Sequence, residues 1–116
     1  MFRFESLEIW KLAVEYGNKL YDIADSFPSR EMYGLGSQLR RASVSISSNI
    51  AEGSGANTNR DFSNFIDIGI KSALETVNIL YFAKSRRYID EPKQKELYEE
   101  AEKIIRKMGA FKKGLK

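Results

Sequence analysis

Few residue types in this sequence could carry out acid–base or nucleophilic chemistry. Its 116 residues include no histidine and no cysteine, so the commonest general base and the commonest transition-metal ligands are absent. Glu52 and Glu75 could in principle form a pair of carboxylates for acid–base catalysis. No nucleophile stands beside them, and we favour salt bridges between subunits for both. The sequence therefore predicts a protein that is not an enzyme, with no catalytic residue, no metal site and no cofactor.

Two neighbouring arginines, Arg40 and Arg41, are the first candidates for contact with phosphate. A guanidinium group can form two parallel hydrogen bonds to a phosphate group. Arg41 also falls in one helical row with Ser45, Ser48 and Glu52, where an ion pair within or between subunits would explain it. We favour the ion pair and keep phosphate binding as the alternative.

Basic residues gather in two further places along the chain. The first 102 residues hold thirteen basic and sixteen acidic side chains, a net charge of −3, whereas the last fourteen hold six basic side chains and no acidic one. Such clusters are typical of proteins that bind RNA or DNA, although helix-dipole compensation and solubility would also explain them. The predicted nucleic-acid-binding residues in these two clusters are Lys84, Arg86 and Arg87, and then Lys103, Arg106, Lys107, Lys112 and Lys113, with Lys116 completing the tail.

The elements that must position these side chains are helices. Apolar residues recur at helical spacing in four stretches, and no stretch shows the alternation of a strand. The predicted helices cover about residues 7–26, 29–53, 59–86 and from 91 onward. Pro28 ends the first helix, and the candidate caps that start the next three are Ser29, Thr58 and Asp90, the last followed by Pro92. The glycines at 53 and 55 end the second helix, whose predicted inner face is Leu35, Leu39, Ala42, Ser43, Ile46, Ile50 and Gly53. Short connections favour a single domain, residues 1–116, folded as an all-α, antiparallel up-down-up-down four-helix bundle.

Helices 7–26 and 59–86 each carry two apolar stripes on nearly opposite sides, whereas a surface helix of a monomer normally carries one. In the first helix, the stripe that we expect to face the core is Trp10, Ala13, Val14, Gly17, Tyr21 and Ala24. The second stripe is Ile9, Leu12, Tyr16, Ile23 and Phe27. Exposed apolar patches usually mark an interface, so the pattern predicts a homo-oligomer. The predicted interface residues are Ser45, Ser48 and Glu52 in the second helix and Ile68, Glu75, Ile79 and Phe82 in the third.

Composition limits the class of protein. Hydrophobic residues make up 42% and charged residues 30% of the chain, which is typical of a soluble globular domain. No apolar run approaches the roughly 20 residues that span a bilayer, and the opening segment is too charged for a signal peptide. Together with the absence of cysteine, these features lead us to expect a cytoplasmic protein with no membrane partner.

One run carries a specific resemblance. Residues 39–55, reading LRRASVSISSNIAEGSG, closely resemble the signature of small four-helix-bundle proteins encoded within intervening sequences of bacterial 23S rRNA genes, roughly LRRA-x-VSI-P-SNIAEG. The resemblance extends to the opening FESLEIWKLAVE, the turn FPSREMYGL, Phe62, Phe65 and Glu75. Ser47 stands where members of this family commonly have proline, which affects a kink in the helix rather than the fold.

The resemblance implies a four-helix bundle that assembles as a homopentamer. The family is similar to the accessory variability protein of diversity-generating retroelements, a pentameric barrel thought to bind nucleic acid and a reverse transcriptase. We therefore expect a non-enzymatic homo-oligomer, a pentamer on this resemblance, that binds RNA or DNA through basic side chains. The alternative is an oligomeric scaffold whose partner is another protein.

Overall fold

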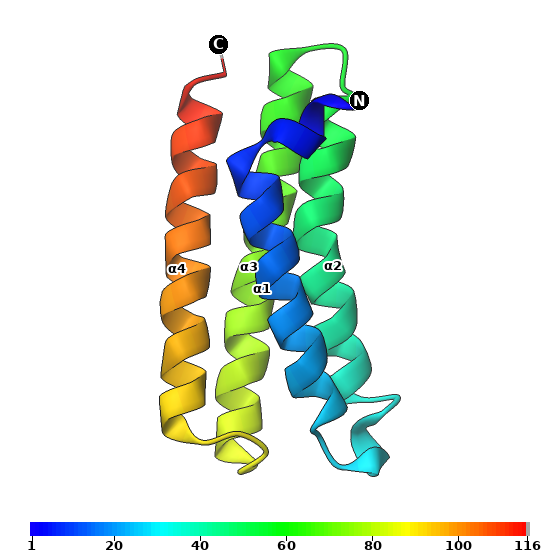
Figure 1. Ribbon diagram of the computed structural model, residues 1–116, viewed down its shortest axis with the longest axis vertical. Coiled ribbons are helices and arrows are strands. Elements are labelled where there is room, and N and C mark those ends of the chain that lie inside the picture. The colour runs from blue at the N-terminus through cyan, green and yellow to red at the C-terminus, as the bar shows by residue number, and fades with distance from the viewer. Residues whose placement is uncertain (116) are drawn as a thin grey trace.

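The computed structural model describes residues 1–115; Lys116, the last basic residue of the tail, lies outside the described residues. Four helices make up most of the described chain, α1 (Glu8–Asp25), α2 (Leu35–Ser54), α3 (Asn59–Ser85) and α4 (Glu91–Lys113), with single 3-10 turns at Arg3–Ser6 and Ser29–Glu31 (Figure 1). None of these helices is long and apolar enough to pass through a lipid bilayer.

The four helices form an antiparallel up-down bundle. Each helix packs against the next in the chain, and α4 also packs against α1, so that α1 and α3 lie diagonally opposite. The bundle is elongated, with extents of 44 × 24 × 21 Å. Both termini and the α2–α3 connection lie at one end, and the α1–α2 and α3–α4 connections lie at the other, as Figure 1 shows. We call the first the terminal end and the second the loop end. The predicted all-α bundle topology is confirmed.

Helix starts follow the predicted capping signals in two of three cases. Thr58 Oγ1 accepts a hydrogen bond from the Asp61 backbone N–H at 3.1 Å and starts α3, and Asp90 Oδ1 accepts from Lys93 N–H at 2.9 Å and starts α4. Each such cap typically stabilises a helix by about 1 kcal/mol. The predicted start of the second helix near residue 29 was wrong, because glycines at 34 and 36 disfavour early helix formation and α2 begins only at Leu35.

The predicted inner face of α2 is confirmed except at Leu35, which is only partly buried. Its buried residues are Gly36, Leu39, Ala42, Ser43, Ile46, Ile50 and Gly53. Small side chains let α3 approach closely, and a Cβ atom built at Gly53 would lie 2.7 Å from Phe65 Cβ. The contact between α2 and α3 therefore depends on the absence of a side chain at this position.

The prediction of two opposite stripes on α1 and α3 was wrong. The buried residues of α1 come from both stripes, with Leu20 in addition, and are Ile9, Ala13, Tyr16, Leu20 and Ala24. Tyr21, expected in the core, is 40% exposed. On α3 the buried residues include Ile79, which was expected to lie on the outer side. A helix in a four-helix bundle contacts two neighbours, so its buried arc is wide enough to include members of both stripes.

A buried polar pair joins the two diagonal helices through the centre of the core. The Tyr16 hydroxyl lies 2.9 Å from Thr76 Oγ1, and both side chains are fully buried. Because the Thr76 hydroxyl donates its own proton to the Ala73 carbonyl at 2.6 Å, Tyr16 must be the donor to Thr76. Burial raises the pKa of Tyr16 to about 12, so the phenol is neutral across the physiological range.

Candidate interaction surfaces

The two carboxylates considered for catalysis lie apart on the outside of the bundle. Ser45 of α2 faces Ser72 of α3, and the two helices run in opposite directions from that point. Glu52 lies seven residues beyond Ser45 and Glu75 three residues beyond Ser72, which separates them by roughly 15 Å along the bundle axis. Two carboxylates at that separation along the axis do not act on one reacting atom. Within residues 1–115, no three acidic side chains gather where they could hold a metal ion.

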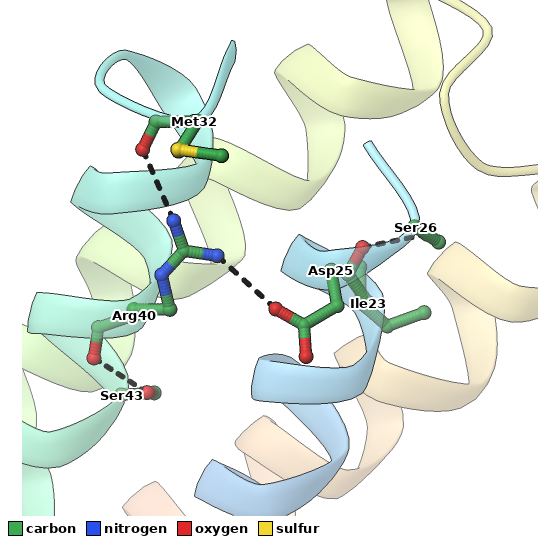
Figure 2. A network of polar contacts seen from close by, with 6 residues as sticks. All are labelled: Ile23, Asp25, Ser26, Met32, Arg40 and Ser43. Carbon is green, nitrogen blue, oxygen red and sulfur yellow. Dashed lines mark hydrogen bonds and ion pairs between the residues drawn. The ribbon is translucent and has the colours of Figure 1, made fainter. Parts of the chain in front are cut away.

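Arg40 is held by its own protomer, as Figure 2 shows. Its Nη1 atom lies 3.3 Å from Asp25 Oδ1 at the end of α1, and its Nη2 atom donates to the Met32 carbonyl at 3.0 Å. These contacts join the start of α2 to α1 and to the connection between them. The Arg40 guanidinium group therefore uses hydrogen-bond donors in contacts that stabilise the fold. Arg41, in contrast, is exposed and forms no ion pair with the rest of the described chain.

The basic cluster at the loop end is only partly engaged. Lys84 Nζ lies 3.6 Å from Glu91 Oε2 across the α3–α4 connection, and the Arg86 guanidinium group lies 6.0 Å from the centre of the Tyr88 ring. Arg87 is exposed and adopts a left-handed backbone conformation with φ of 63°. Among residues 1–115, no carboxylate pairs with Arg86 or Arg87.

The second basic cluster lies on the half of α4 that reaches the terminal end. Lys107 pairs with Glu8 at 3.2 Å and Lys112 with Asp67 at 2.8 Å, which anchors α4 to α1 and α3. The remaining predicted members, Lys103, Arg106 and Lys113, are exposed. Because α4 is 23 residues, or about 34 Å, long, the two clusters lie at opposite ends of the bundle (Figure 1). They do not form one continuous patch on a single protomer.

Two of the predicted interface residues make contacts within their own chain. The Ser45 and Ser72 hydroxyls are 2.8 Å apart between α2 and α3, and the Asn49 side-chain amide donates to Ser45 Oγ at 3.1 Å. Ile79 is 3% exposed and belongs to the core. Ile79 therefore has little surface left to offer a second subunit, and its placement at an interface is corrected. Ser45 is partly buried and bonded within the chain, and its place at an interface stays a prediction.

The structure brings the other predicted interface residues together on one surface. Ile68 and Glu75 flank Ser72 on α3, and Ile68 is 46% and Phe82 57% exposed. Because Ser72 lies at the contact with α2, these α3 residues adjoin the outer row of α2. We call this surface the seam face; its residues are Arg41, Ser48 and Glu52 from α2 and Ile68, Glu75 and Phe82 from α3.

A comparison with protein families identifies the family to which this chain belongs. Residues 5–110 match the profile of the family described as 23S rRNA-intervening sequence protein. The chain belongs to this family. No curated protein sequence matches it significantly. The matched segment of this intervening-sequence protein covers α1, α2, α3 and most of α4, and it includes the whole seam face and the basic cluster of the loop end. Lys112 and Lys113 lie beyond it.

Sequence reasoning missed a set of contacts that joins the two connections of this intervening-sequence protein at its loop end. Glu31 Oε1 accepts a hydrogen bond from Leu35 N–H at 3.0 Å, and Glu31 Oε2 accepts one from the Tyr88 hydroxyl at 2.8 Å. The pKa of Glu31 is held below its ordinary value, chiefly by the hydrogen bond from Leu35 N–H. The hydrogen bond from the Tyr88 hydroxyl and the nearby positive charge of Arg30 lower it further. Periodicity could not reveal these contacts, because the residues lie in turns 57 positions apart.

An apolar hollow on α3 and α4 was also missed. It measures about 260 Å³ and is lined by Leu74, Val77, Tyr98, Glu102 and Ile105. Leu74 is 54% exposed, and the rings of Tyr81 and Tyr98 meet edge to face at 6.1 Å beside it. The hollow lies on the flank of α3 that faces α4, away from the seam face. The sequence did contain a signal, since Leu74 is a large apolar residue of this helix that was not assigned to the interface.

Proposed function

We propose that this protein is a non-enzymatic homo-oligomer that binds RNA or DNA through basic side chains. The observation that carries the proposal is that each end of the bundle presents cations with no carboxylate partner among residues 1–115. They are Arg86 and Arg87 at the loop end and Lys103, Arg106 and Lys113 toward the terminal end. Cations of this kind are free to neutralise phosphates and release the counterions condensed on a nucleic acid.

The seam face supports the assembly part of the proposal. It places the exposed apolar side chains of Ile68 and Phe82 beside charges of both signs, from Arg41, Glu52 and Glu75. Apolar contact surrounded by complementary charge suits an interface between identical subunits. On the resemblance to the retroelement accessory protein we propose five subunits, which would present each basic cluster five times around a ring.

Repetition around a ring changes the strength of binding expected from a few charges. Each of the two basic clusters offers only two or three unpaired cations on a single chain, and such a surface binds weakly at physiological salt. Several copies acting on one polyanion add their contacts, and the affinity then falls steeply as salt rises. Strong dependence on salt is therefore the signature that this proposal requires.

Titration of a fluorescently labelled RNA oligonucleotide tests the proposal. Two phosphate contacts predict a loss of affinity of about tenfold between about 50 and 200 mM salt, and further contacts predict more. Replacing Arg86 and Arg87 together with serine should weaken binding and reduce the salt dependence. The matched control replaces Lys19 and Lys93 together with serine, because both are paired with a carboxylate and lie outside the two basic clusters. Absence of binding to RNA and DNA at low salt would contradict the proposal.

A scaffold that binds another protein is the second candidate function. The hollow lined by Leu74, Val77 and Ile105 favours it, because apolar side chains on the surface of a folded protomer are suited to covering by a partner. The same titration separates the two candidates. A protein of this kind would show no affinity for nucleic acid at low salt.

A further inference from the structure

The loop end of the bundle is a single rigid platform built from two connections. The Tyr88 hydroxyl donates to Glu31 at 2.8 Å, and the Tyr88 ring packs on the Phe27 ring with centres 5.4 Å apart. Residues that follow α1 are thereby bonded to residues that follow α3. Side chains on this platform keep a fixed spacing, which a binding site requires.

The acidic groups of the platform are all committed to internal bonds. Glu31 accepts from Leu35 N–H and from Tyr88, Asp25 pairs with Arg40, Asp90 caps α4 and Glu91 pairs with Lys84. Lys84 and Arg40 are in turn the cations that these carboxylates neutralise.

Three arginines of the platform form no ion pair, although Arg30 lies near Glu31 and its Nη2 atom donates to the Tyr88 hydroxyl at 3.4 Å. The guanidinium groups of Arg30 and Arg86 lie 5.8 Å and 6.0 Å from the centre of the same Tyr88 ring, and Arg87 follows directly in the turn. All three side chains are exposed, and none forms an ion pair within residues 1–115. Arg30 comes from the α1–α2 connection and was not among the residues that the sequence singled out. Neighbouring guanidinium groups of this kind suit successive phosphates of one strand.

An aromatic side chain in the same connection as Arg30 is almost fully exposed. Tyr33 lies three residues after Arg30 and is 92% exposed, more than any other tyrosine of the described chain. Neither the core nor an internal hydrogen bond among residues 1–115 accounts for its ring. An exposed ring and unpaired cations at the same end of a protein are the combination on which unpaired bases stack while their phosphates are neutralised.

We propose that the loop end binds single-stranded nucleic acid, with one base stacked on Tyr33 and the adjacent phosphates held by Arg30, Arg86 and Arg87. This inference rests on the proposed function and narrows it to one end of the bundle and one form of the ligand. Bases inside a duplex have no free face to offer Tyr33, so a single strand is bound in preference to the duplex of the same sequence.

The test compares three variants by fluorescence anisotropy with a labelled oligonucleotide, as a single strand and annealed to its complement. Tyr33→Ala removes the ring and should weaken single-strand binding by about tenfold or more, with little effect on the duplex. Tyr33→Phe keeps the stacking surface and should retain the affinity. Tyr98→Ala removes an exposed ring at mid-helix in α4 and is the matched control. Tyr33 is so exposed that thermal unfolding should not change among its variants.

The outcomes distinguish this inference from the proposed function. If the protein binds the single strand in a salt-dependent way, and if Tyr33→Ala weakens this binding whereas Tyr33→Phe keeps it, both the loop-end site and the proposed function are supported. Salt-dependent binding that Tyr33→Ala leaves unchanged, or equal affinity for single strand and duplex, overturns the loop-end site and leaves the proposed function standing. Failure to bind either form at low salt overturns both.

Discussion

Glu31 shows how one side chain can join two connections that are far apart in the sequence. It accepts the first backbone N–H of α2 and the hydroxyl of Tyr88, and both bonds favour its ionised form. Because the folded pKa is lowered, this contribution to stability is present above the ordinary value of 4.5 and is lost as the pH falls through the folded pKa.

Glu31→Gln should therefore destabilise the protein at neutral pH and have progressively less effect below pH 4.5. Urea unfolding followed by circular dichroism, repeated across the acid range, measures the difference in the free energy of unfolding between the wild type and Glu31→Gln. Glu96→Gln on exposed α4 serves as the control, since its partner Lys93 is a surface contact at 3.4 Å. A difference that stays constant as the pH falls would contradict the role assigned to the carboxylate.

The buried phenol of Tyr16 predicts the opposite pH dependence. The pKa of this group is 10.0 in the unfolded chain and about 12 in the folded chain. The unfolded state is therefore favoured as the pH rises through that interval. The wild-type protein should lose up to about 3 kcal/mol of stability there from this group alone. Tyr16→Phe should cost about 1 kcal/mol at neutral pH, through the lost hydrogen bond to Thr76.

Urea unfolding of both proteins from neutral pH into the alkaline range checks this prediction. The stability of Tyr16→Phe should fall less steeply above pH 10 than that of the wild type, so that the two curves converge and then cross. Parallel curves would show that the tyrosine is ionised equally in the folded and unfolded states.

At the scale of helices, the contact between α2 and α3 depends on two glycines that differ in what surrounds them. A Cβ at Gly53 would lie 2.7 Å from Phe65 Cβ and 2.8 Å from the Phe62 ring, whereas a Cβ at Gly69 would lie 2.8 Å from the tip of the Met108 side chain. The Phe65 Cβ atom is fixed to the backbone, but the end of a methionine can move.

Gly53→Ala should accordingly destabilise the fold by about 1–3 kcal/mol through overpacking, despite the better helix propensity of alanine. Gly69→Ala should cost less, because Met108 can adopt another rotamer. Thermal and urea unfolding measure both variants. Equal effects, or a stabilised Gly53→Ala, would mean that α2 and α3 can separate without loss.

The sequence predicted the bundle and the inner face of α2 because local chemistry decides both. Capping at Thr58 and Asp90 and the periodicity of small and apolar residues need no knowledge of the neighbours. Periodicity could not give the width of the buried arc on α3, and so Ile79 was assigned outward. Nor could it foresee that Asp25 and the Met32 carbonyl hold Arg40, or that Tyr33 stands free in a turn, because these depend on how the connections fold back.

At the scale of the whole molecule, the proposal is that the subunits assemble through the seam face. Ile68→Lys places a charge among its apolar residues and should reduce the oligomer to smaller species while the helical content stays the same. Leu74→Lys makes the same change on the opposite flank of α3 at a similar exposure, and should leave the assembly intact. Light scattering of both variants measures this. Equal masses for Ile68→Lys and the wild type would show that the subunits meet elsewhere.

Light scattering across a size-exclusion peak of the wild-type protein mixed with a single-stranded RNA oligonucleotide tests assembly and binding together. We expect one peak with the mass of several subunits, five on the family resemblance, and with nucleic-acid absorbance in the same peak that disappears at high salt. A peak with the mass of a single chain, eluting apart from the oligonucleotide, would contradict both the assembly and the binding.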